Sequence, residues 1–259
     1  MSDISIVTAF FDIGRDSWSG NPSLPSYLHR TTDTYFERFK RLAQLENEMF
    51  VFTSPEFIER VIKLRAGKKT NIVAFDFPGE FVKLRHLISW AQQHPDYRKL
   101  INPSQIHNPE YWSPDYVLVN LLKSHFAARS AQTATNNMLA WVDFGYCRSP
   151  DTIPDIKVWQ PDFDPNFIHM FSLKQYNGAS LMDIIANNDV YVTGPCIVAS
   201  KDLWSQLEND IMTAVYHLLD QNLIDDDQTF LLIASLAKPE LYKLHPVSYN
   251  NWFTVFRDF

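Results

Sequence analysis

One eight-residue stretch, LAWVDFGY at residues 139–146, constrains the fold of this chain more than any other. Its apolar first half is typical of a buried strand that ends abruptly at Asp143, and Gly145 then lets the backbone turn. An acid at the exit of a buried strand is where α/β enzymes hold a catalytic or metal-binding carboxylate. An aspartate also often caps the turn that follows it, so this stretch alone leaves a purely structural role open.

Apolar runs and amphipathic segments alternate along the first half of the chain. The alternation predicts strands at 4–11, 48–53, 70–76 and 139–142, helices at 31–45, 55–64, 80–93 and 114–129, and a loop at 94–112. This order favours an α/β fold with a doubly wound, mixed and mostly parallel sheet that is flanked by helices. No linker or repeat divides the chain, so one Rossmann-like domain over residues 1–259 is expected.

The second half of the chain is less regular. A strand is expected at 190–198, interrupted at Gly194, where a bulge or a close ligand is plausible. A long helix is expected at 201–219, and the acidic run DDDQ at 225–228 precedes an apolar helix at 230–236. Acids at the start of a helix match its dipole, so this run has a structural explanation as well as a chemical one.

The composition excludes several classes of protein. With 46% apolar residues over 259 positions, the chain can bury a full core. Its start lacks the pattern of a signal peptide, and no apolar run approaches the ~20 residues that span a bilayer. Two cysteines form no disulfide framework and favour a reducing, cytoplasmic compartment. The net charge of −7 argues against general nucleic-acid binding.

The charge is unevenly distributed along the chain. Residues 1–129 hold 16 Lys and Arg against 14 Asp and Glu, whereas residues 130–259 hold 7 against 16. Such asymmetry suits an anion held mainly by the first half and a cation held by the second, although uneven solvated surface charge is common.

Familiar catalytic signatures are absent, among them phosphate-binding loops, dinucleotide-binding glycine motifs, the zinc-protease motif and the nucleophile elbow. Two motifs, IVTAFFDIGR at 6–15 and WVDFGY at 141–146, resemble the HtrL/YibB group of bacterial proteins, and the resemblance runs over essentially the whole chain. The order of the polar residues also resembles GT-A nucleotide-sugar glycosyltransferases and, more distantly, the family-eight retaining transferases.

The resemblance implies how a donor would be held. The nucleotide would lie along the end of the first strand and its loop, formed by Thr8, Ala9, Phe10, Asp12, Gly14 and Arg15. Lys123 would meet the phosphates. Asp143 and His245 would bind Mn²⁺ or Mg²⁺ beside Gly145. Where related transferases carry Asp-x-Asp this chain has Asp-Phe-Gly, so one carboxylate is missing, and Arg15 and Lys123 are expected to carry more of the diphosphate charge.

The same resemblance implies the chemistry. Gly194 would border the transferred sugar, while Asp227 and Gln228 would act at the reaction centre. The expected activity moves a hexose or N-acetylhexosamine from a UDP-sugar to a glycan or lipid-linked glycan acceptor, of the bacterial surface polysaccharide or lipooligosaccharide type. The protein would then work in the cytoplasm, with peripheral association at the inner face of the membrane.

Two other classes of function remain open. A catalytically silent GT-A-like domain that binds a sugar nucleotide or a glycan is supported by the missing second acid. A metal-dependent phosphohydrolase fits less well, because only scattered single acids are present. A shared site makes a geometric prediction: residues 12–15 and Asp143 should lie on neighbouring loops at the carboxyl ends of strands.

Overall fold

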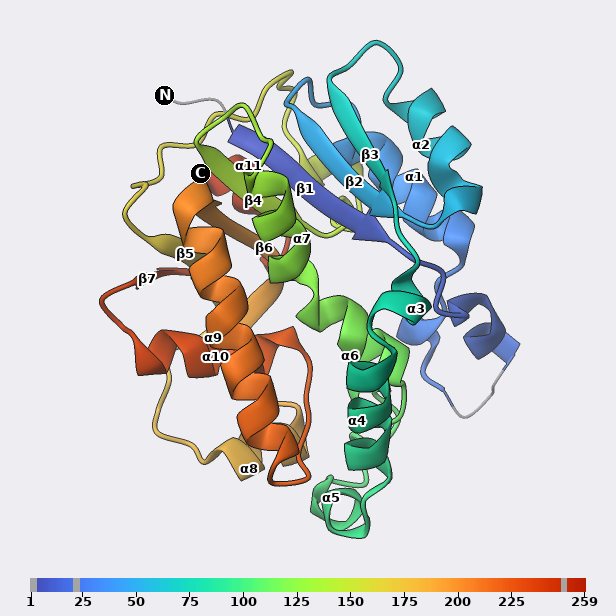
Figure 1. Cartoon of the computed structure of the whole chain (residues 1–259), viewed down its shortest axis with the longest axis vertical. Helices are drawn as coiled ribbons and strands as arrows, with labels where there is room; N and C mark the ends of the chain where they lie inside the picture. Colours follow the sequence, from blue (N-terminus) through green and yellow to red (C-terminus); the bar gives the residue numbers. More distant parts are fainter. Residues whose placement is uncertain (1–3, 21–23, 248–250) are drawn as a thin grey trace.

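A computed structural model describes residues 4–20, 24–247 and 251–259 (Figure 1). Within these residues seven strands form one sheet in the order β3-β2-β1-β4-β6-β5-β7. The strands are β1 Ile4–Phe10, β2 Met49–Thr53, β3 Thr70–Ala74, β4 Met138–Val142, β5 Ile168–Ser172, β6 Val192–Ser200 and β7 Tyr242–Pro246. Neighbours among β1 to β4 are parallel, as are β5 and β7, whereas β6 is antiparallel to β4 and β5. The predicted mixed, mostly parallel α/β sheet is confirmed.

Helices cover both faces of this sheet. The α-helices are α1 Thr32–Leu42, α2 Ile58–Leu64, α3 Phe77–Glu80, α4 Val82–Gln93, α5 Pro95–Leu100, α6 Pro114–Leu121, α7 Lys123–Ala131, α8 Leu181–Asn187, α9 Lys201–Leu219, α10 Asp227–Ala237 and α11 Val255–Asp258. Short 3-10 segments are Arg15–Gly20, Ser26–Leu28, Pro55–Phe57, Pro109–Tyr111 and Pro150–Thr152. Among the helices of the described residues, none has the length and apolarity that a bilayer crossing requires.

Several elements differ from the sequence-based expectation. The helix expected at 114–129 breaks at Leu122, whose φ of −80° and ψ of 0° leave the helical range, so Lys123 begins a separate helix. Strand β6 runs through Gly194 without a break, and its pairing with β5 shifts register between Thr193 and Val198, which agrees with the expected bulge. The expected loop at 94–112 contains α5. Strand β5 and helix α8 are additions, because five- to seven-residue apolar runs carry too little periodicity to identify from sequence.

Two apolar cores lie on opposite faces of the sheet. Alternation along β1 sends Val7 to one face and Ile6 to the other. The first face packs against side chains of α4, α6, α7, α9 and α10, and the second against those of α1 and α11. In Figure 1, α7 and α9 lie in front of the sheet and α1 and α11 behind it. Helix α1 begins at a defined cap, since the Thr31 side chain accepts a hydrogen bond from the N–H of Thr34.

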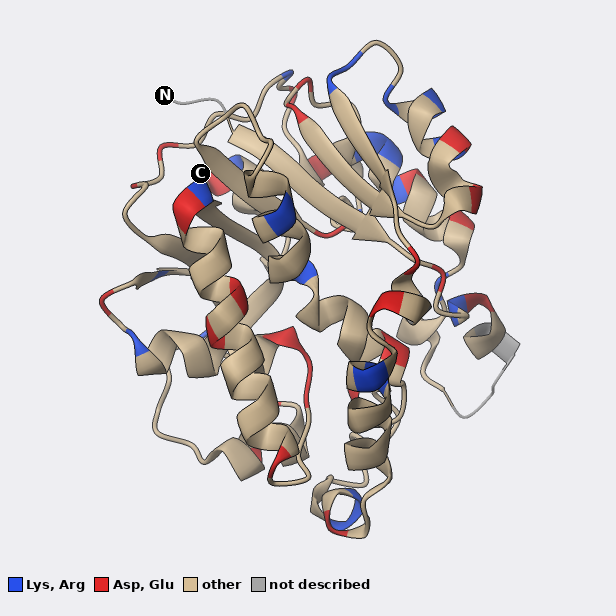
Figure 2. Cartoon of the chain, in the orientation of Figure 1, with Lys and Arg blue, Asp and Glu red and all other residues tan. Residues whose placement is uncertain are grey.

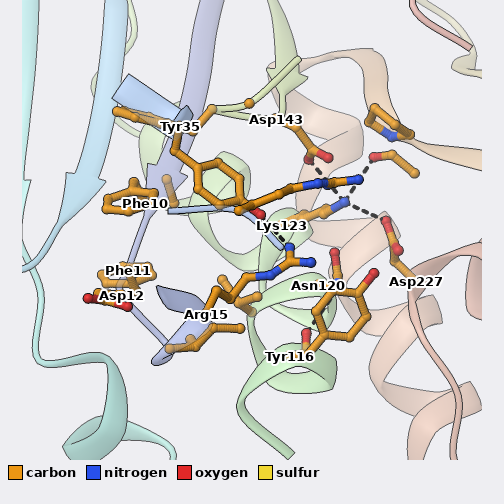
Figure 3. A pocket seen from close by; sticks show the side chains of 18 of the residues that line it. Phe10, Phe11, Asp12, Arg15, Tyr35, Tyr116, Asn120, Lys123, Asp143 and Asp227 are labelled. Carbon is orange, nitrogen blue, oxygen red and sulfur yellow. Dashed lines mark hydrogen bonds and ion pairs between the residues drawn. The ribbon is translucent and has the colours of Figure 1, made fainter. Parts of the chain in front are cut away.

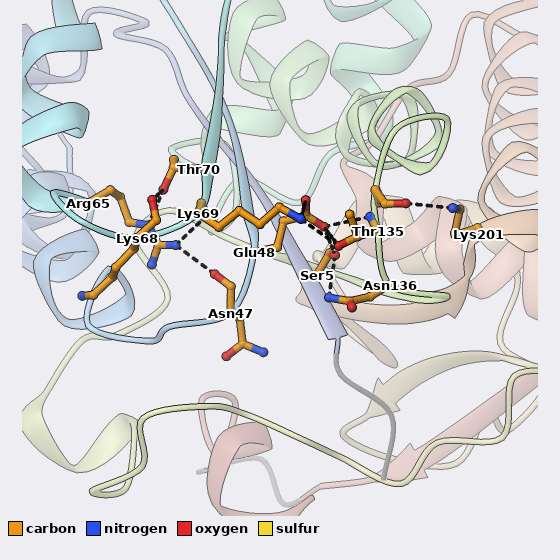
Figure 4. Close-up of polar contacts among 11 residues, drawn as sticks. Ser5, Asn47, Glu48, Arg65, Lys68, Lys69, Thr70, Thr135, Asn136 and Lys201 are labelled. Atoms are coloured by element: carbon orange, nitrogen blue, oxygen red, sulfur yellow. Dashed lines mark hydrogen bonds and ion pairs between the residues drawn. The ribbon is translucent and has the colours of Figure 1, made fainter.

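Polar contacts surround the buried Glu48 at the amino ends of the strands (Figure 4). Oε2 of Glu48 accepts hydrogen bonds from Oγ of Ser5 at 2.7 Å and from N and Oγ1 of Thr135 at 3.0 and 2.9 Å. Nζ of Lys69 lies 2.9 Å from the other carboxylate oxygen. Burial alone would raise the pKa of Glu48, but the donors from Ser5, Thr135 and Lys69 outweigh it and lower the pKa to about 2. Both carboxylate oxygens of Glu48 therefore have partners within the protein.

The carboxyl ends of β1 and β4 lie side by side, because the two strands are parallel neighbours. Strand β6 runs the opposite way, so its first residues, including Gly194, reach the same end. The N–H of Asp143 donates to the carbonyl of Pro195 at 2.9 Å, which continues the contact between the two strands past the end of β4. Three chain segments therefore meet at this end of the sheet.

Candidate functional site

A cavity of about 190 Å³ opens at the carboxyl ends of β1 and β4 (Figure 3). Both the loop after β1 and the turn after β4 contribute to its wall, as the predicted shared site requires. Most of the predicted site residues line it: Ala9, Phe10, Asp12, Arg15, Lys123, Asp143, Gly145, Gly194, Asp227 and Gln228. The sequence pattern thus brings together residues from β1, α7, β4, β6 and α10.

Two predicted nucleotide-binding residues, Thr8 and Gly14, do not line the cavity. Thr8 is fully buried inside the sheet, because it lies two residues before the end of β1. Gly14 has a φ of +79° and donates its N–H to Oδ1 of Asp12 at 2.8 Å. Both residues shape the wall rather than face a ligand, and Asp12 has the turn-forming role that its sequence also allows.

Arg15 is buried against aromatic rings beside the cavity. The side chain is only 8% exposed, and its guanidinium carbon lies 4.7 Å from the ring centre of Trp18 and 5.8 Å from that of Tyr116. Nη1 donates to the hydroxyl of Tyr35, and Nη2 donates to the carbonyl of Leu28 at 3.4 Å. The Nε atom has no hydrogen-bond partner among the described residues. A buried cation with an unused donor is poised to bind an acceptor.

Lys123 joins two carboxylates of the cavity (Figure 3). Its Nζ lies 3.0 Å from Oδ1 of Asp143 and 2.7 Å from Oδ2 of Asp227, and it donates to the carbonyl of Gly194 at 3.2 Å. Burial lowers the pKa of Lys123, but the charges of the two aspartates outweigh burial and raise the pKa above its ordinary value. Asp143, Lys123 and Asp227 therefore form a stable charged group, which we call the Lys123 triad.

Gly194 makes room for this triad. A Cβ atom at position 194 would lie 1.8 Å from Oδ2 of Asp227, far inside van der Waals contact. Glycine is therefore required for the carboxylate of Asp227 to reach Lys123. The close approach expected at Gly194 is present, but a side chain of the protein itself makes it.

The acidic run at 225–227 stands at the start of α10 (Figure 2), and its members have different roles. Asp226 is the helix cap, because its Oδ1 accepts a hydrogen bond from the N–H of Gln228 at 3.1 Å. Asp227 turns instead toward Lys123. Burial raises the pKa of Asp227, and the charge of Lys123 offsets part of this rise. The structural explanation of the run thus applies to Asp226, while Asp227 and Gln228 line the cavity.

The sequence analysis does not single out three further arginines, Arg30, Arg38 and Arg148. Arg30 and Arg148 line the cavity, and Arg38 lies beside its wall, because a Cβ atom at Gly145 would lie 3.8 Å from Cδ of Arg38. The guanidinium carbon of Arg148 lies 3.9 Å from the ring centre of Phe253. Partial desolvation, followed by the charges of Arg30 and Arg38, lowers the pKa of Arg148 to about 10. Positive charge is therefore concentrated on this wall.

Helix α6 supplies another part of the wall that the sequence analysis misses, next to the predicted Lys123. Tyr116, Val119, Asn120 and Lys123 all line the cavity. Their spacing of three, four and seven residues is that of one helix face, and this periodicity was the available signal. The remaining unpredicted side chains of the wall include Tyr35, Trp252 and Phe253.

His245 lies away from the cavity, in β7, with β5 and β6 between it and β4. Alternation along β7 turns Tyr242 toward α9, where its hydroxyl donates to Asp210 at 2.7 Å, and turns His245 toward the opposite face. Nε2 of His245 lies 2.8 Å from Nδ1 of His169, and burial, followed by the charge of His169, lowers the pKa of His245 to about 4. The expectation that Asp143 and His245 bind one metal ion together is therefore wrong, because the two side chains lie apart.

The remaining donors do not fit a resident Mn²⁺ or Mg²⁺. Hard divalent ions take about six oxygen ligands. Oδ1 of Asp143 already accepts a hydrogen bond from Nε1 of Trp141 at 2.8 Å and pairs with Lys123, whose ammonium group stands between Asp143 and Asp227. Among the residues that the structure describes, no three His, Cys, Asp or Glu side chains gather as a metal site would need. We therefore assign no metal ligands here.

Comparison with known proteins identifies the family. The chain matches the HtrL_YibB family, described as bacterial protein of unknown function, over residues 2–259. It is 36% identical over 264 residues to Protein HtrL of Escherichia coli (strain K12), and this match covers 100% of the chain and 93% of that protein. The chain therefore belongs to the HtrL_YibB family, as its two motifs suggest.

Two solved structures are similar over most of the chain. The apo form of mouse xyloside xylosyltransferase 1 matches with a TM-score of 0.46 and 12% identity, over 94% of this chain and 85% of that one. The apo form of the glycosyltransferase GlyE from Streptococcus pneumoniae TIGR4 matches with a TM-score of 0.43 and 6% identity, over 95% of this chain and 45% of that one. We draw the function from the residues of the cavity rather than from these likenesses.

Proposed function

We propose that this protein is a glycosyltransferase that moves a hexose or N-acetylhexosamine from a UDP-sugar to a glycan acceptor. One observation carries the proposal. The loop after β1, Lys123, Asp143 and the Asp227–Gln228 pair line one cavity. Their order along the chain is the one in which the sequence resembles nucleotide-sugar transferases. Residues that are scattered over more than 200 positions and meet at the ligand-binding end of a sheet support a shared chemical task.

The proposed reaction exchanges one glycosidic bond for another. The bond between the anomeric carbon and the β-phosphate oxygen breaks, and its electron pair leaves on UDP. The acceptor hydroxyl oxygen forms the new bond to that carbon, and one proton is released. Positive charge develops on the sugar ring and negative charge on the diphosphate, so the transition state is stabilised by carboxylates near the first and by cations near the second.

The cavity offers both kinds of group. Asp227 and Asp143 are held in fixed positions by Lys123, which favours electrostatic stabilisation of a cationic sugar. Gln228 has its backbone N–H occupied by Asp226, and its side chain lines the cavity, where its amide can orient an acceptor hydroxyl. Arg15 stands nearby with the cationic charge that a leaving diphosphate requires. No step is assigned to a metal ion, because the donors do not form a metal site.

The acceptor in this proposal is a glycan or a lipid-linked glycan of the bacterial surface polysaccharide or lipooligosaccharide type. We place the activity in the cytoplasm, with peripheral association at the inner face of the membrane. Both cysteines, Cys147 and Cys196, are free and buried, which agrees with a reducing compartment.

The proposal is tested by measuring UDP release from UDP-glucose, UDP-galactose and their N-acetylhexosamine counterparts, with and without a glycan acceptor. Asp227→Asn and Gln228→Ala should lower kcat by about 100-fold while changing donor affinity much less, because the interaction strengthens in the transition state. Asp220→Asn and Gln93→Ala, exposed positions outside the cavity, are matched controls and should leave kcat unchanged.

A catalytically silent domain is the second candidate, favoured by the Asp-Phe-Gly sequence at 143–145 and by the pairing of both aspartates with Lys123. It predicts that nucleotide sugars raise the melting temperature of the protein, since a ligand that binds only the folded state stabilises it. It also predicts that no UDP is released with any acceptor. Binding without turnover would therefore replace the proposed enzyme with a sugar-nucleotide-binding protein.

A further inference from the structure

The resemblance assigns the donor phosphates to Lys123, but the contacts of this lysine leave it no free donor. A lysine ammonium group has three N–H donors. Nζ of Lys123 has three acceptors within reach, one each from Asp143, Asp227 and Gly194, at 3.0, 2.7 and 3.2 Å. A diphosphate would have to displace one of these contacts. Another set of cations must therefore meet the phosphates if the cavity binds a nucleotide sugar.

Four arginines form such a set, which we call the arginine group: Arg15, Arg30 and Arg148, which line the cavity, and Arg38, which lies beside Gly145 of its wall. They come from the loop after β1, the segment before α1, α1 itself and the turn after β4. Across the described ranges 4–20, 24–247 and 251–259, no carboxylate lies within 4.0 Å of any of their guanidinium nitrogens. Arginine side chains at one site without carboxylate partners are typical of phosphate recognition.

Arg15 supplies an independent observation that points to a ligand. More than nine-tenths of this residue is buried, and Nε lacks a hydrogen-bond partner in the described part of the chain. Its other nitrogens donate to the Tyr35 hydroxyl and the Leu28 carbonyl, both neutral acceptors. A buried guanidinium that no carboxylate contacts is costly in the free protein, and an anion in the cavity would remove much of that cost.

The members of the arginine group also repel one another. Burial, and then the charges of Arg30, Arg15 and Arg41, lower the pKa of Arg38. Burial, and then the charges of Arg30 and Arg38, likewise lower the pKa of Arg148. Asp12 and Asp16 also lie on this wall, where they accept the N–H groups of Gly14 and Thr32, each at 2.8 Å. The wall is therefore matched to an anion with more than one charge.

We propose that the arginine group neutralises the diphosphate of the nucleotide-sugar donor, in the place of a divalent cation, so that donor binding needs no metal. This inference rests on the proposed function and adds a substrate-binding role for Arg15, Arg30, Arg38 and Arg148. The Lys123 triad then stands next to the sugar rather than next to the phosphates. The missing second acid of the Asp-Phe-Gly sequence follows from this arrangement, since a site without a metal has no need of it.

The test is calorimetric titration of the full chain with UDP, GDP and ADP, in EDTA and in MnCl₂. We expect at least one of these diphosphates to bind with the same Kd in both buffers. Arg148→Gln and Arg30→Gln should each weaken that binding by about 10- to 100-fold, the usual loss for a hydrogen bond to a charged group. Arg148→Lys should lose less, because it retains the charge. Arg129→Gln, an exposed arginine of α7 outside the cavity, is the control and should bind like the unaltered protein.

Each outcome has a distinct meaning. Binding that requires MnCl₂ overturns this inference and leaves the proposed function standing. Binding in EDTA that neither arginine variant weakens also overturns it. Failure of all three diphosphates in both buffers overturns the inference and the proposed function together. Thermal unfolding of each variant verifies folding, and the exposed position of Arg148 makes a stable variant available.

Discussion

At the amino end of the sheet the carboxylate of Glu48 is buried among donors, whereas at the carboxyl end Glu110 and Asp225 are buried among other acids. Hydrogen bonds and Lys69 lower the pKa of Glu48 to about 2 despite its burial. Burial, followed by the charge of Asp225, raises the pKa of Glu110 to about 8, and burial raises that of Asp225 to about 7. The same chemical group is thus stabilised as an anion at one end and destabilised as an anion at the other.

This contrast separates structural polar groups from those available for chemistry. The cluster around Glu48 satisfies each carboxylate oxygen within the protein, so it adds stability and leaves nothing to bind a ligand. The carboxyl end keeps acids in an unfavourable environment and leaves Nε of the buried Arg15 without a hydrogen-bond partner among the described residues. Groups with such perturbed pKa values cluster at functional sites, because ligand binding or catalysis requires them even though they lower the stability of the fold.

The largest effect should come from Lys123→Met, which removes the cation between two buried carboxylates. Breaking a buried ion pair by removing one partner costs about 3–5 kcal/mol, since the remaining charge is uncompensated. We expect a loss of that size in the free energy of unfolding at pH 7, measured by urea denaturation. Lys40→Met on the exposed side of α1 is the control and should change stability little. A Lys123 variant as stable as the control would mean that the triad is not held as an ion pair.

Glu48→Gln should have the next largest effect. Its folded-state pKa lies below the ordinary value near 4.5, so its contribution is present above pH 4.5 and is lost as pH falls toward 2. The variant should lose about 3 kcal/mol of unfolding free energy at pH 7. The difference between variant and unaltered protein should shrink in urea titrations at pH 3.

The exposed neighbour Glu46 provides the control for this experiment, because Glu46→Gln removes a charge from the same segment without entering the cluster. A constant difference between Glu48→Gln and the unaltered protein from pH 7 to pH 3 would contradict the assigned pKa. It would then be packing, rather than charge, that Glu48 contributes.

An effect of opposite sign is expected for Glu110→Gln. The folded protein retains a proton on Glu110 up to about pH 8, whereas the unfolded chain releases it near pH 4.5. Stability therefore falls as pH rises through this window, and a glutamine that cannot ionise removes that fall. The variant should be more stable than the unaltered protein at pH 8 and should differ little from it at pH 4.5, measured by urea unfolding.

Glu56→Gln, at an exposed position before α2, should show no such pH dependence. A Glu110→Gln variant that is destabilised equally at both pH values would indicate that the carboxylate makes contacts that an amide cannot replace. The two ends of the sheet would then differ less than the comparison states.

Much of the fold and part of the site could be predicted from the sequence. The parallel strands were identified from short apolar runs, and the carboxyl ends of such strands meet at one edge. This rule alone brings Asp12 and Asp143 into one cavity. It succeeds because both residues lie within two positions of the end of a strand, so their positions depend on the sheet and little on the loops between.

Other parts of the site depend on geometry that a sequence pattern does not contain. His245 was assigned from its place in the chain order, but alternation along β7 turns it to the opposite face of the sheet. The sequence predicts a close approach at Gly194, but only the structure shows that the carboxylate of Asp227 makes it. Arg30 and Arg148 come from irregular segments, where neither helical nor strand periodicity indicates which way a side chain points.

The contact between Gly194 and Asp227 has a consequence for how this protein can change over time. A methyl group at position 194 and the carboxylate of Asp227 in its present orientation cannot coexist, so the two positions can change only together. A descendant that acquires a side chain at 194 must turn away or shorten the residue at 227, and either change leaves Lys123 with one anion fewer. The absence of a Cβ atom at Gly194, 33 residues before Asp227 in the chain, thus limits which descendants can keep the Lys123 triad.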